Sequence, residues 1–111
     1  MADTATSLKQ LNGRLATLGK AAPQVMGAFR TLLQEASRSG TVDAGLKELI
    51  AVALAVQKGC GDCIVFHVAN ARGHGASRAQ LVEVLGVCIE MGGGPAAVYA
   101  GYALEAFDQP G

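Results

Sequence analysis

The stretch Glu48–His67, which reads ELIAVALAVQKGCGDCIVFH, decides the fold of this chain. Its first half is apolar on nearly every side through Leu49–Val56, and a helix that is apolar all round is a buried helix. Gly59 provides a C-terminal break, and a second helical pattern begins at Cys60. The stretch therefore predicts two helices joined by a tight turn, the first of them inside the core.

Helical patterns also fill the chain on both sides of this stretch. The leucines at positions 8, 11, 15 and 18 and a second apolar stripe after Pro23 predict two ordinary amphipathic helices, to which we assign no chemistry. Asp43 is the expected N-cap of the buried helix, and Ser77 with Gln80 forms a capping box for a later one. The run Gly92–Pro95 should end one helix and start another. Residues 1–7 are small and polar and are expected to be loose, and no segment alternates like a strand. The fold class is therefore all-α with about six helices, expected near residues 8–18, 23–37, 44–58, 60–72, 81–91 and 95–107.

Length and composition limit the classes of function. The 111 residues allow one domain, 1–111, and are too few for two. The formal net charge is zero, so we expect no general attraction to nucleic acid or to an anionic membrane. Hydrophobic residues make up 50% of the chain and charged residues only 16%, which is apolar for a small domain. Because a monomer of this composition would leave large apolar patches wet, we expect a homo-oligomer.

The chain shows no sign of export or of a membrane span. Its N-terminus lacks a basic run followed by an apolar core, and its longest apolar runs fall short of the roughly 18 residues of a membrane helix. Three cysteines without a secretion signal are typical of cytosolic thiols. We therefore expect a cytoplasmic protein.

Cys60 and Cys63 form a CxxC pair at the start of a helix. This spacing places both sulfurs on one face, close enough for a disulfide after modest adjustment. The unpaired N–H groups of a helix N-terminus favour a thiolate, so the pair can cycle between dithiol and disulfide. Half of a zinc site and two incidental thiols are the alternatives that the motif leaves open. Cys88, among apolar neighbours, is expected to be a buried filler.

His67 lies four residues after Cys63, so the two side chains share a helix face. A neutral imidazole there can take the thiol proton, and its cation then stabilises the thiolate. Glu48 has only small or apolar helical neighbours, so we expect it to be buried, and a buried carboxylate needs a hydrogen-bond donor. A relay from Glu48 through His67 to the cysteines would satisfy the acid and activate the thiol. The alternatives are a core histidine bonded to a carbonyl and a first-turn Glu48 in solvent.

The pattern Glu48-x11-Cys60-x2-Cys63-x3-His67 resembles the signature of the AhpD-like (alkylhydroperoxidase D-like) proteins of the carboxymuconolactone decarboxylase family. The resemblance covers a core at about residues 42–107, preceded by N-terminal helices at 1–40. It implies an all-helical, single-repeat fold that assembles as a trimer or hexamer. It also implies a thiol-dependent peroxidase or disulfide oxidoreductase with Glu48, Cys60, Cys63 and His67 as catalytic residues and no cofactor. The substrate would be a hydroperoxide or a disulfide, and the reductant a lipoyl-protein or a thioredoxin-like protein.

One departure from the family pattern stands between the two cysteines. Some members have a histidine just before the second cysteine, where this chain has Asp62. An ionised acid so close to the sulfurs would raise the pKa of the thiols and lower peroxidase activity. We expect Cys63 to attack the peroxide, because His67 is nearer to it along the helix. Cys60 is expected to be more exposed and to resolve the intermediate, although the opposite assignment stays open.

Three other functions are compatible with the same residues. Cys60, Cys63 and His67 could bind zinc with Glu48 or water, although no second CxxC or His pair accompanies them. A lactone decarboxylase is disfavoured because that branch of the family does not depend on a CxxC pair. A non-catalytic oligomer whose disulfide senses redox state is the third alternative.

Overall fold

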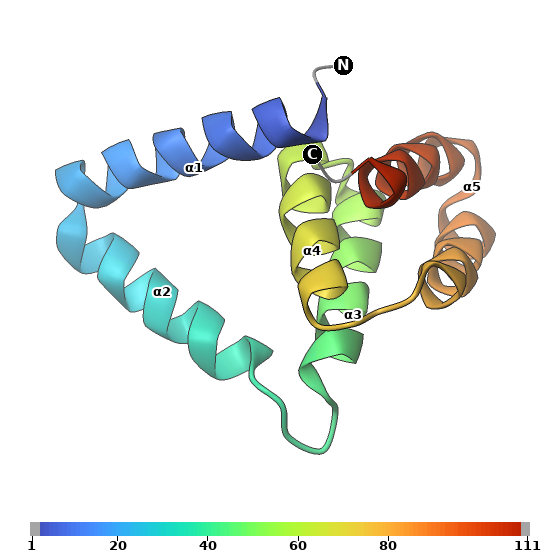
Figure 1. Ribbon diagram of the computed structural model, residues 1–111, viewed down its shortest axis with the longest axis horizontal. Coiled ribbons are helices and arrows are strands. Elements are labelled where there is room, and N and C mark those ends of the chain that lie inside the picture. The colour runs from blue at the N-terminus through green and yellow to red at the C-terminus, as the bar shows by residue number, and fades with distance from the viewer. Residues whose placement is uncertain (1–2, 110–111) are drawn as a thin grey trace.

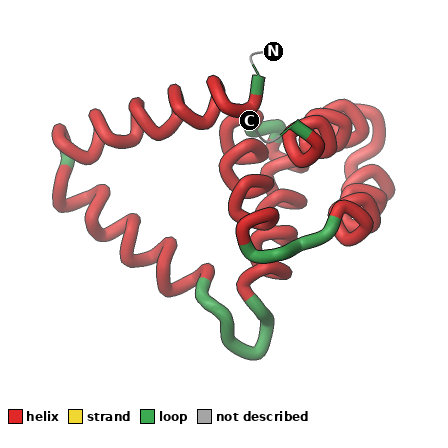
Figure 2. Tube along the Cα trace, in the orientation of Figure 1, coloured by secondary structure: helices red, strands yellow, loops and turns green. Residues whose placement is uncertain are grey.

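The computed structural model describes residues 3–109 and contains only helices and loops in that range (Figure 2). The all-α class is therefore confirmed. Its helices are α1 (Thr4–Ala21), α2 (Pro23–Ser37), α3 (Ala44–Lys58), α4 (Gly61–Gly73) and α5 (Arg78–Asp108).

The predicted helix–turn–helix is the antiparallel pair α3 and α4 at the centre of the molecule (Figure 1). Asp43 caps α3 by accepting a hydrogen bond from the Leu46 N–H. At the other end Gly59 adopts φ 67°, in the left-handed region that glycine enters without strain. A Cβ atom at this position would stand 3.2 Å from the Tyr99 ring, so the turn before Cys60 needs glycine for space as well.

The hydrophobic core lies between α3, α4 and α5. Val52, Ile64 and Ala103, one from each helix, are fully buried. Burying a side chain the size of valine or isoleucine stabilises the fold by roughly 1.5–3 kcal/mol. These three helices therefore hold the α3–α4 turn in place.

The last two expected helices are two limbs of one element, α5. The capping box of Ser77 and Gln80 starts α5 as predicted. Non-helical backbone at Gly93, just before Pro95, kinks the helix without separating the limbs by a loop, which is why five helices are found rather than six. Gln57 of α3 donates a hydrogen bond to the Cys88 carbonyl, 2.7 Å away, and so fastens α5 to α3 ahead of the kink.

The α5 helix also has the length and hydropathy of a membrane span, with a mean hydropathy of 1.5 over 18 residues. It supplies Leu81, Leu85 and Ala103 to the core and is broken at Gly93. Core helices of soluble proteins meet the same criterion, so the finding is weak support for a membrane helix.

The α1 and α2 helices form an arm that extends away from the other three helices, with Pro23 in the first turn of α2 (Figure 1). Thr4 is the buried residue of α1, and α2 has none, so the apolar face of the arm is largely uncovered. The expectation that residues 1–7 are loose is wrong from Thr4 onward. Asp3 caps α1 by accepting a hydrogen bond from the Thr6 N–H, 3.0 Å away, a signal that the leucine spacing does not contain. Residues 1 and 2 lie outside the described range.

Candidate functional site

The carboxylate of Glu48 and the imidazole of His67 meet between α3 and α4. The distance from Glu48 Oε2 to His67 Nδ1 is 2.7 Å, and Glu48 is only 5% exposed. The alternative of a solvent-facing Glu48 is therefore wrong, and so is that of a histidine bonded only to a backbone carbonyl. With Nδ1 donating to the carboxylate, Nε2 of the neutral imidazole is left as a proton acceptor.

Cys60 and Cys63 are joined by a disulfide at the N-terminus of α4, with their Cα atoms 5.2 Å apart. Cys60 is the N-cap residue, and its Sγ accepts a hydrogen bond from the Cys63 N–H at 3.2 Å. This contact and the helix dipole favour negative charge on the Cys60 sulfur when the disulfide opens. Cys63 is exposed and Cys60 half-buried, so the expected order of exposure is reversed. The N-cap position turns the Cys60 side chain back over the first turn of the helix.

An apolar cleft of about 220 Å³ opens beside the disulfide. Cys63 and His67 share its wall, so the structure brings the second cysteine and the histidine to one solvent-accessible space. The arm contributes the opposite wall. Sequence reasoning assigned the arm helices no chemistry, because their apolar stripes are typical of ordinary amphipathic helices. The lining residues are Leu11, Leu15, Phe29, Leu33, Asp62, Cys63, Phe66 and His67.

Asp62, the departure from the family pattern, has a partner that the sequence did not indicate. Arg14 of α1 places Nη2 2.9 Å from Asp62 Oδ2, across 48 residues of sequence. The two side chains are 59% and 52% exposed. The arm thus supplies a cation as well as an apolar wall to the site.

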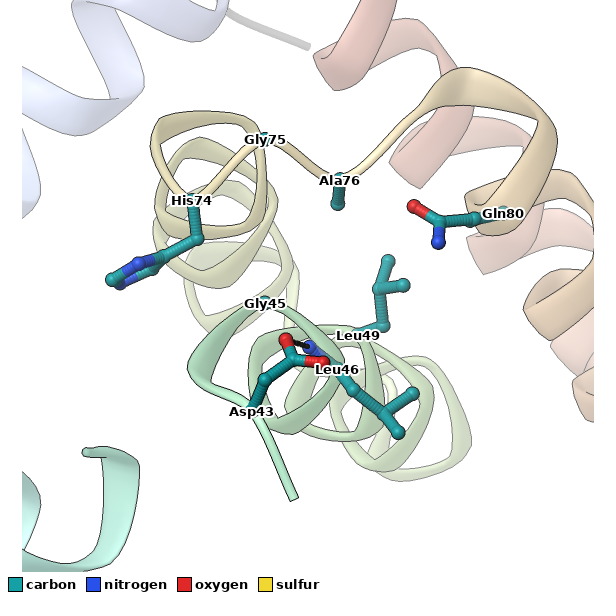
Figure 3. A pocket seen from close by; sticks show the side chains of 8 residues that line it. All are labelled: Asp43, Gly45, Leu46, Leu49, His74, Gly75, Ala76 and Gln80. Carbon is teal, nitrogen blue, oxygen red and sulfur yellow. Dashed lines mark hydrogen bonds between the residues drawn. The ribbon is translucent and has the colours of Figure 1, made fainter. Parts of the chain in front are cut away.

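A second, more polar pocket lies at the opposite ends of α3 and α4 (Figure 3). The Asp43 carboxylate is used there to cap α3, and the ring of His74 points away from Asp43 and Gln80. This pocket does not assemble a reactive cluster. Within residues 3–109, no three His, Cys, Asp or Glu side chains are grouped so that they could hold a metal ion.

Cys88 takes no part in the site. It is 3% exposed in the core between α3 and α5, and its thiol lies 3.9 Å from the Ala53 carbonyl. Burial raises the pKa of the Cys88 thiol.

Comparison with known proteins places this arrangement in a family. A sequence profile of the carboxymuconolactone decarboxylase family matches residues 23–106. The chain belongs to the carboxymuconolactone decarboxylase family. The matched range takes in α2 as well as residues 42–106 of the core on which the sequence signature rests.

Relatives of similar length support this assignment to the carboxymuconolactone decarboxylase family. The chain is 52% identical over 106 residues to an uncharacterized protein of Cupriavidus necator, covering 96% of this chain and 94% of that one. It is 35% identical over 103 residues to uncharacterized protein 4 of the cox locus of Paracoccus denitrificans, covering 93% of each chain.

Solved structures of carboxymuconolactone decarboxylase family proteins have the same fold. A Legionella pneumophila member in its apo form gives a TM-score of 0.92 at 43% identity, covering 95% of this chain and 94% of that one. A Thermotoga maritima member, connected by its description with an antioxidative response, gives 0.82 at 21% identity, covering 93% and 88%. The second likeness establishes the fold alone.

Proposed function

We propose that this protein is a thiol-dependent peroxidase and disulfide oxidoreductase of the AhpD-like kind. The observation that carries the proposal is the Cys60–Cys63 disulfide beside a cleft that also exposes His67, itself bonded to the buried Glu48. A vicinal redox pair, a base and an orienting acid are what thiol-based reduction requires. The connection with an antioxidative response is that of the Thermotoga protein, whereas the support for this proposal comes from the residues of this chain.

In the proposed first half-reaction, the Cys63 thiolate attacks one peroxide oxygen of a hydroperoxide. The O–O bond breaks, Cys63 becomes a sulfenic acid, and the departing alkoxide takes a proton from the His67 imidazolium to leave as an alcohol. Cys60 then attacks the Cys63 sulfur, forming the disulfide and releasing water. Glu48 keeps His67 oriented and stabilises its cation during these transfers. One hydroperoxide thus oxidises two thiols.

In the second half-reaction, a dithiol reductant attacks the disulfide. The exposed Cys63 sulfur is the accessible one, so the mixed disulfide forms there and Cys60 leaves as a thiolate. The Cys63 N–H and the N-terminus of α4 stabilise this leaving group. The second thiol of the reductant then attacks the reductant's own sulfur in the mixed disulfide, which releases Cys63 as a thiolate and leaves the reductant as a disulfide. The reductant therefore contacts Cys63, because Cys63 is the more exposed of the two, whereas the sequence alone suggested Cys60. A lipoyl-protein or a thioredoxin-like protein is the proposed reductant.

We propose further that the protein acts as a cytoplasmic homo-oligomer, a trimer or hexamer. Large apolar side chains on the arm and on α5, among them Phe29, Leu32 and Met91, are exposed in the single chain. Covering such a surface is a common reason for self-association. Light scattering coupled to size-exclusion chromatography gives the mass; a monomer at micromolar concentration would contradict this part of the proposal.

The test of function combines thiol counting with intact mass on the reduced protein. One equivalent of tert-butyl hydroperoxide should remove two thiols and two mass units from the wild type. Cys60→Ser should accumulate a sulfenic acid on Cys63 that dimedone traps, whereas Cys63→Ser should react with neither reagent.

Each outcome of this test has a distinct meaning. Slow oxidation by peroxide but fast oxidation by a small disulfide would confine the function to disulfide exchange. Trapping in Cys63→Ser instead would reverse the roles of the cysteines. If both thiols of the wild type stay unreactive toward both oxidants, the proposal is wrong.

A further inference from the structure

Asp62 places a carboxylate in the first turn of α4, the turn whose N-terminus favours a thiolate. It lies between the two cysteines in sequence. An acid in the first turn stabilises the helix by interacting with its dipole, but the same charge offsets the positive potential that favours a thiolate there. A chain that uses Cys60 and Cys63 as nucleophiles therefore needs something to counter this carboxylate.

Arg14 is placed to do so. Its guanidinium Nη2 lies 2.9 Å from Asp62 Oδ2, and the contact joins α1 to the first turn of α4. The planar guanidinium of an arginine matches the geometry of a carboxylate, which suits it to pair with an acid. As an exposed ion pair the contact contributes little to stability, so its loss should leave the protein folded.

Other charged and titratable groups around this end of α4 come from α3, α4 and α5, among them Lys58 in the last turn of α3, two residues before Cys60. Glu48 of α3 is paired with His67 of α4. From α5, the phenol rings of Tyr99 and Tyr102 lie against Gly59 and Gly61, on either side of Cys60. Arg14 is the cation that the arm brings to Asp62, and it comes from outside the residues that form the family signature.

We propose that Arg14 is a positioning residue that holds and neutralises the Asp62 carboxylate, so that the reduced CxxC pair can form its thiolate beside an acid. This role rests on the proposed function, because it matters only if Cys60 and Cys63 act as nucleophiles. Through this contact, helix α1 of the arm influences the ionisation of the two cysteines. Arg14 touches neither the sulfurs nor the substrate in this role and acts through Asp62.

The experiment measures the pH midpoint of thiolate formation in the fully reduced protein. The rate of iodoacetamide alkylation is followed from pH 4 to 10 by mass spectrometry of the peptide that carries Cys60 and Cys63. The variants are Arg14→Gln, Asp62→Asn, their combination, and Lys20→Gln, which removes the same charge from the last turn of α1. Low ionic strength keeps surface charges from being screened.

Arg14→Gln should raise the midpoint by about half a pH unit more than Lys20→Gln does, which is roughly a threefold loss of thiolate below the midpoint. In the D62N background this difference should vanish, because no carboxylate remains to be neutralised. Equal midpoints for R14Q and K20Q, or the same rise in the D62N background, would overturn the proposal.

Peroxide consumption is measured separately on the wild type. If R14Q raises the pH midpoint of thiolate formation but the wild type does not consume peroxide, the peroxidase proposal is wrong and the role of Arg14 is supported. If the wild type consumes peroxide rapidly but R14Q leaves the midpoint unchanged, the role of Arg14 is wrong and the peroxidase proposal is supported.

Discussion

Glu48 Oε2 and His67 Nδ1 lie 2.7 Å apart across the α3–α4 interface, with the carboxylate almost fully buried. The Glu48→Gln variant keeps the size of the side chain but cannot stabilise an imidazolium. We expect kcat/KM for tert-butyl hydroperoxide to fall on the order of 100-fold, the usual range when acid–base assistance is lost. Steady-state kinetics with a dithiol reductant measure the effect. Activity within twofold of the wild type would contradict a relay through Glu48.

The same pair should also couple in stability. His67→Ala leaves the Glu48 carboxylate buried without its partner, so the free energy of unfolding should fall by roughly 3 kcal/mol. The combination of E48Q with H67A should recover part of this loss, since a buried amide is less costly than a buried carboxylate. Urea unfolding followed by circular dichroism measures all three proteins. His74→Ala, on an exposed loop, is the matched control and should change stability by less than about 0.5 kcal/mol; an H67A variant as stable as H74A would refute the coupling.

The three cysteines should react in two classes. Burial raises the pKa of the Cys88 thiol and shields its sulfur, so only Cys60 and Cys63 of the reduced, folded protein should react quickly with an aromatic disulfide reagent. In denaturant all three should react. The double variant C60S/C63S isolates Cys88 and should show no fast phase when folded; a fast phase there would mean that the core around Cys88 opens readily.

Gly59→Ala tests the turn that positions Cys60. The left-handed backbone at Gly59 costs an L-residue roughly 1–2 kcal/mol, and the Tyr99 ring stands 3.2 Å from the position of the new methyl group. Thermal and urea unfolding should therefore show a loss of at least that size. Gly73→Ala, at the end of α4 with nothing within 4 Å of the new methyl, is the control and should be neutral or slightly stabilising. Equal effects of the two variants would argue against the strained turn.

Arg78 and Asp108 should give the stability of the fold a specific dependence on acid. Hydrogen bonds and the charge of Arg78 hold the pKa of the Asp108 carboxyl below its ordinary value. A group whose pKa is lowered on folding contributes stability above its unfolded pKa, near 3.9, and this contribution is lost as the pH falls through the folded value. Asp108→Asn should therefore be less stable than the wild type at pH 7, and the difference should narrow as the pH falls through the lowered pKa of the folded carboxyl.

The partner variant gives the control for this pair. Arg78→Gln should reproduce the deficit of D108N at pH 7, and the combination of both changes should add little to either alone. Urea midpoints in a series of buffers from pH 7 into the acid range measure this. A deficit in D108N that stays constant as the pH falls would assign the effect to something other than the ion pair.

The sequence by itself determined the local features of this protein. Asp43, Gly59 and the Ser77–Gln80 box mark helix ends through contacts that span only three or four residues, so their sequence signals are sufficient. The apolar run in α3 indicated a buried helix, and a carboxylate within it had to find a donor. The CxxC spacing likewise placed two sulfurs within bonding distance without knowledge of the rest of the fold.

Only the tertiary structure decided how the site is enclosed. The Glu48–His67 contact depends on the alignment of α3 against α4, and the Arg14–Asp62 contact joins residues 48 positions apart. The apolar cleft exists because the arm lies across from α4, although its leucine stripes give no indication of which surface they face. Such contacts depend on how whole helices pack, and helical periodicity fixes only which residues share a face.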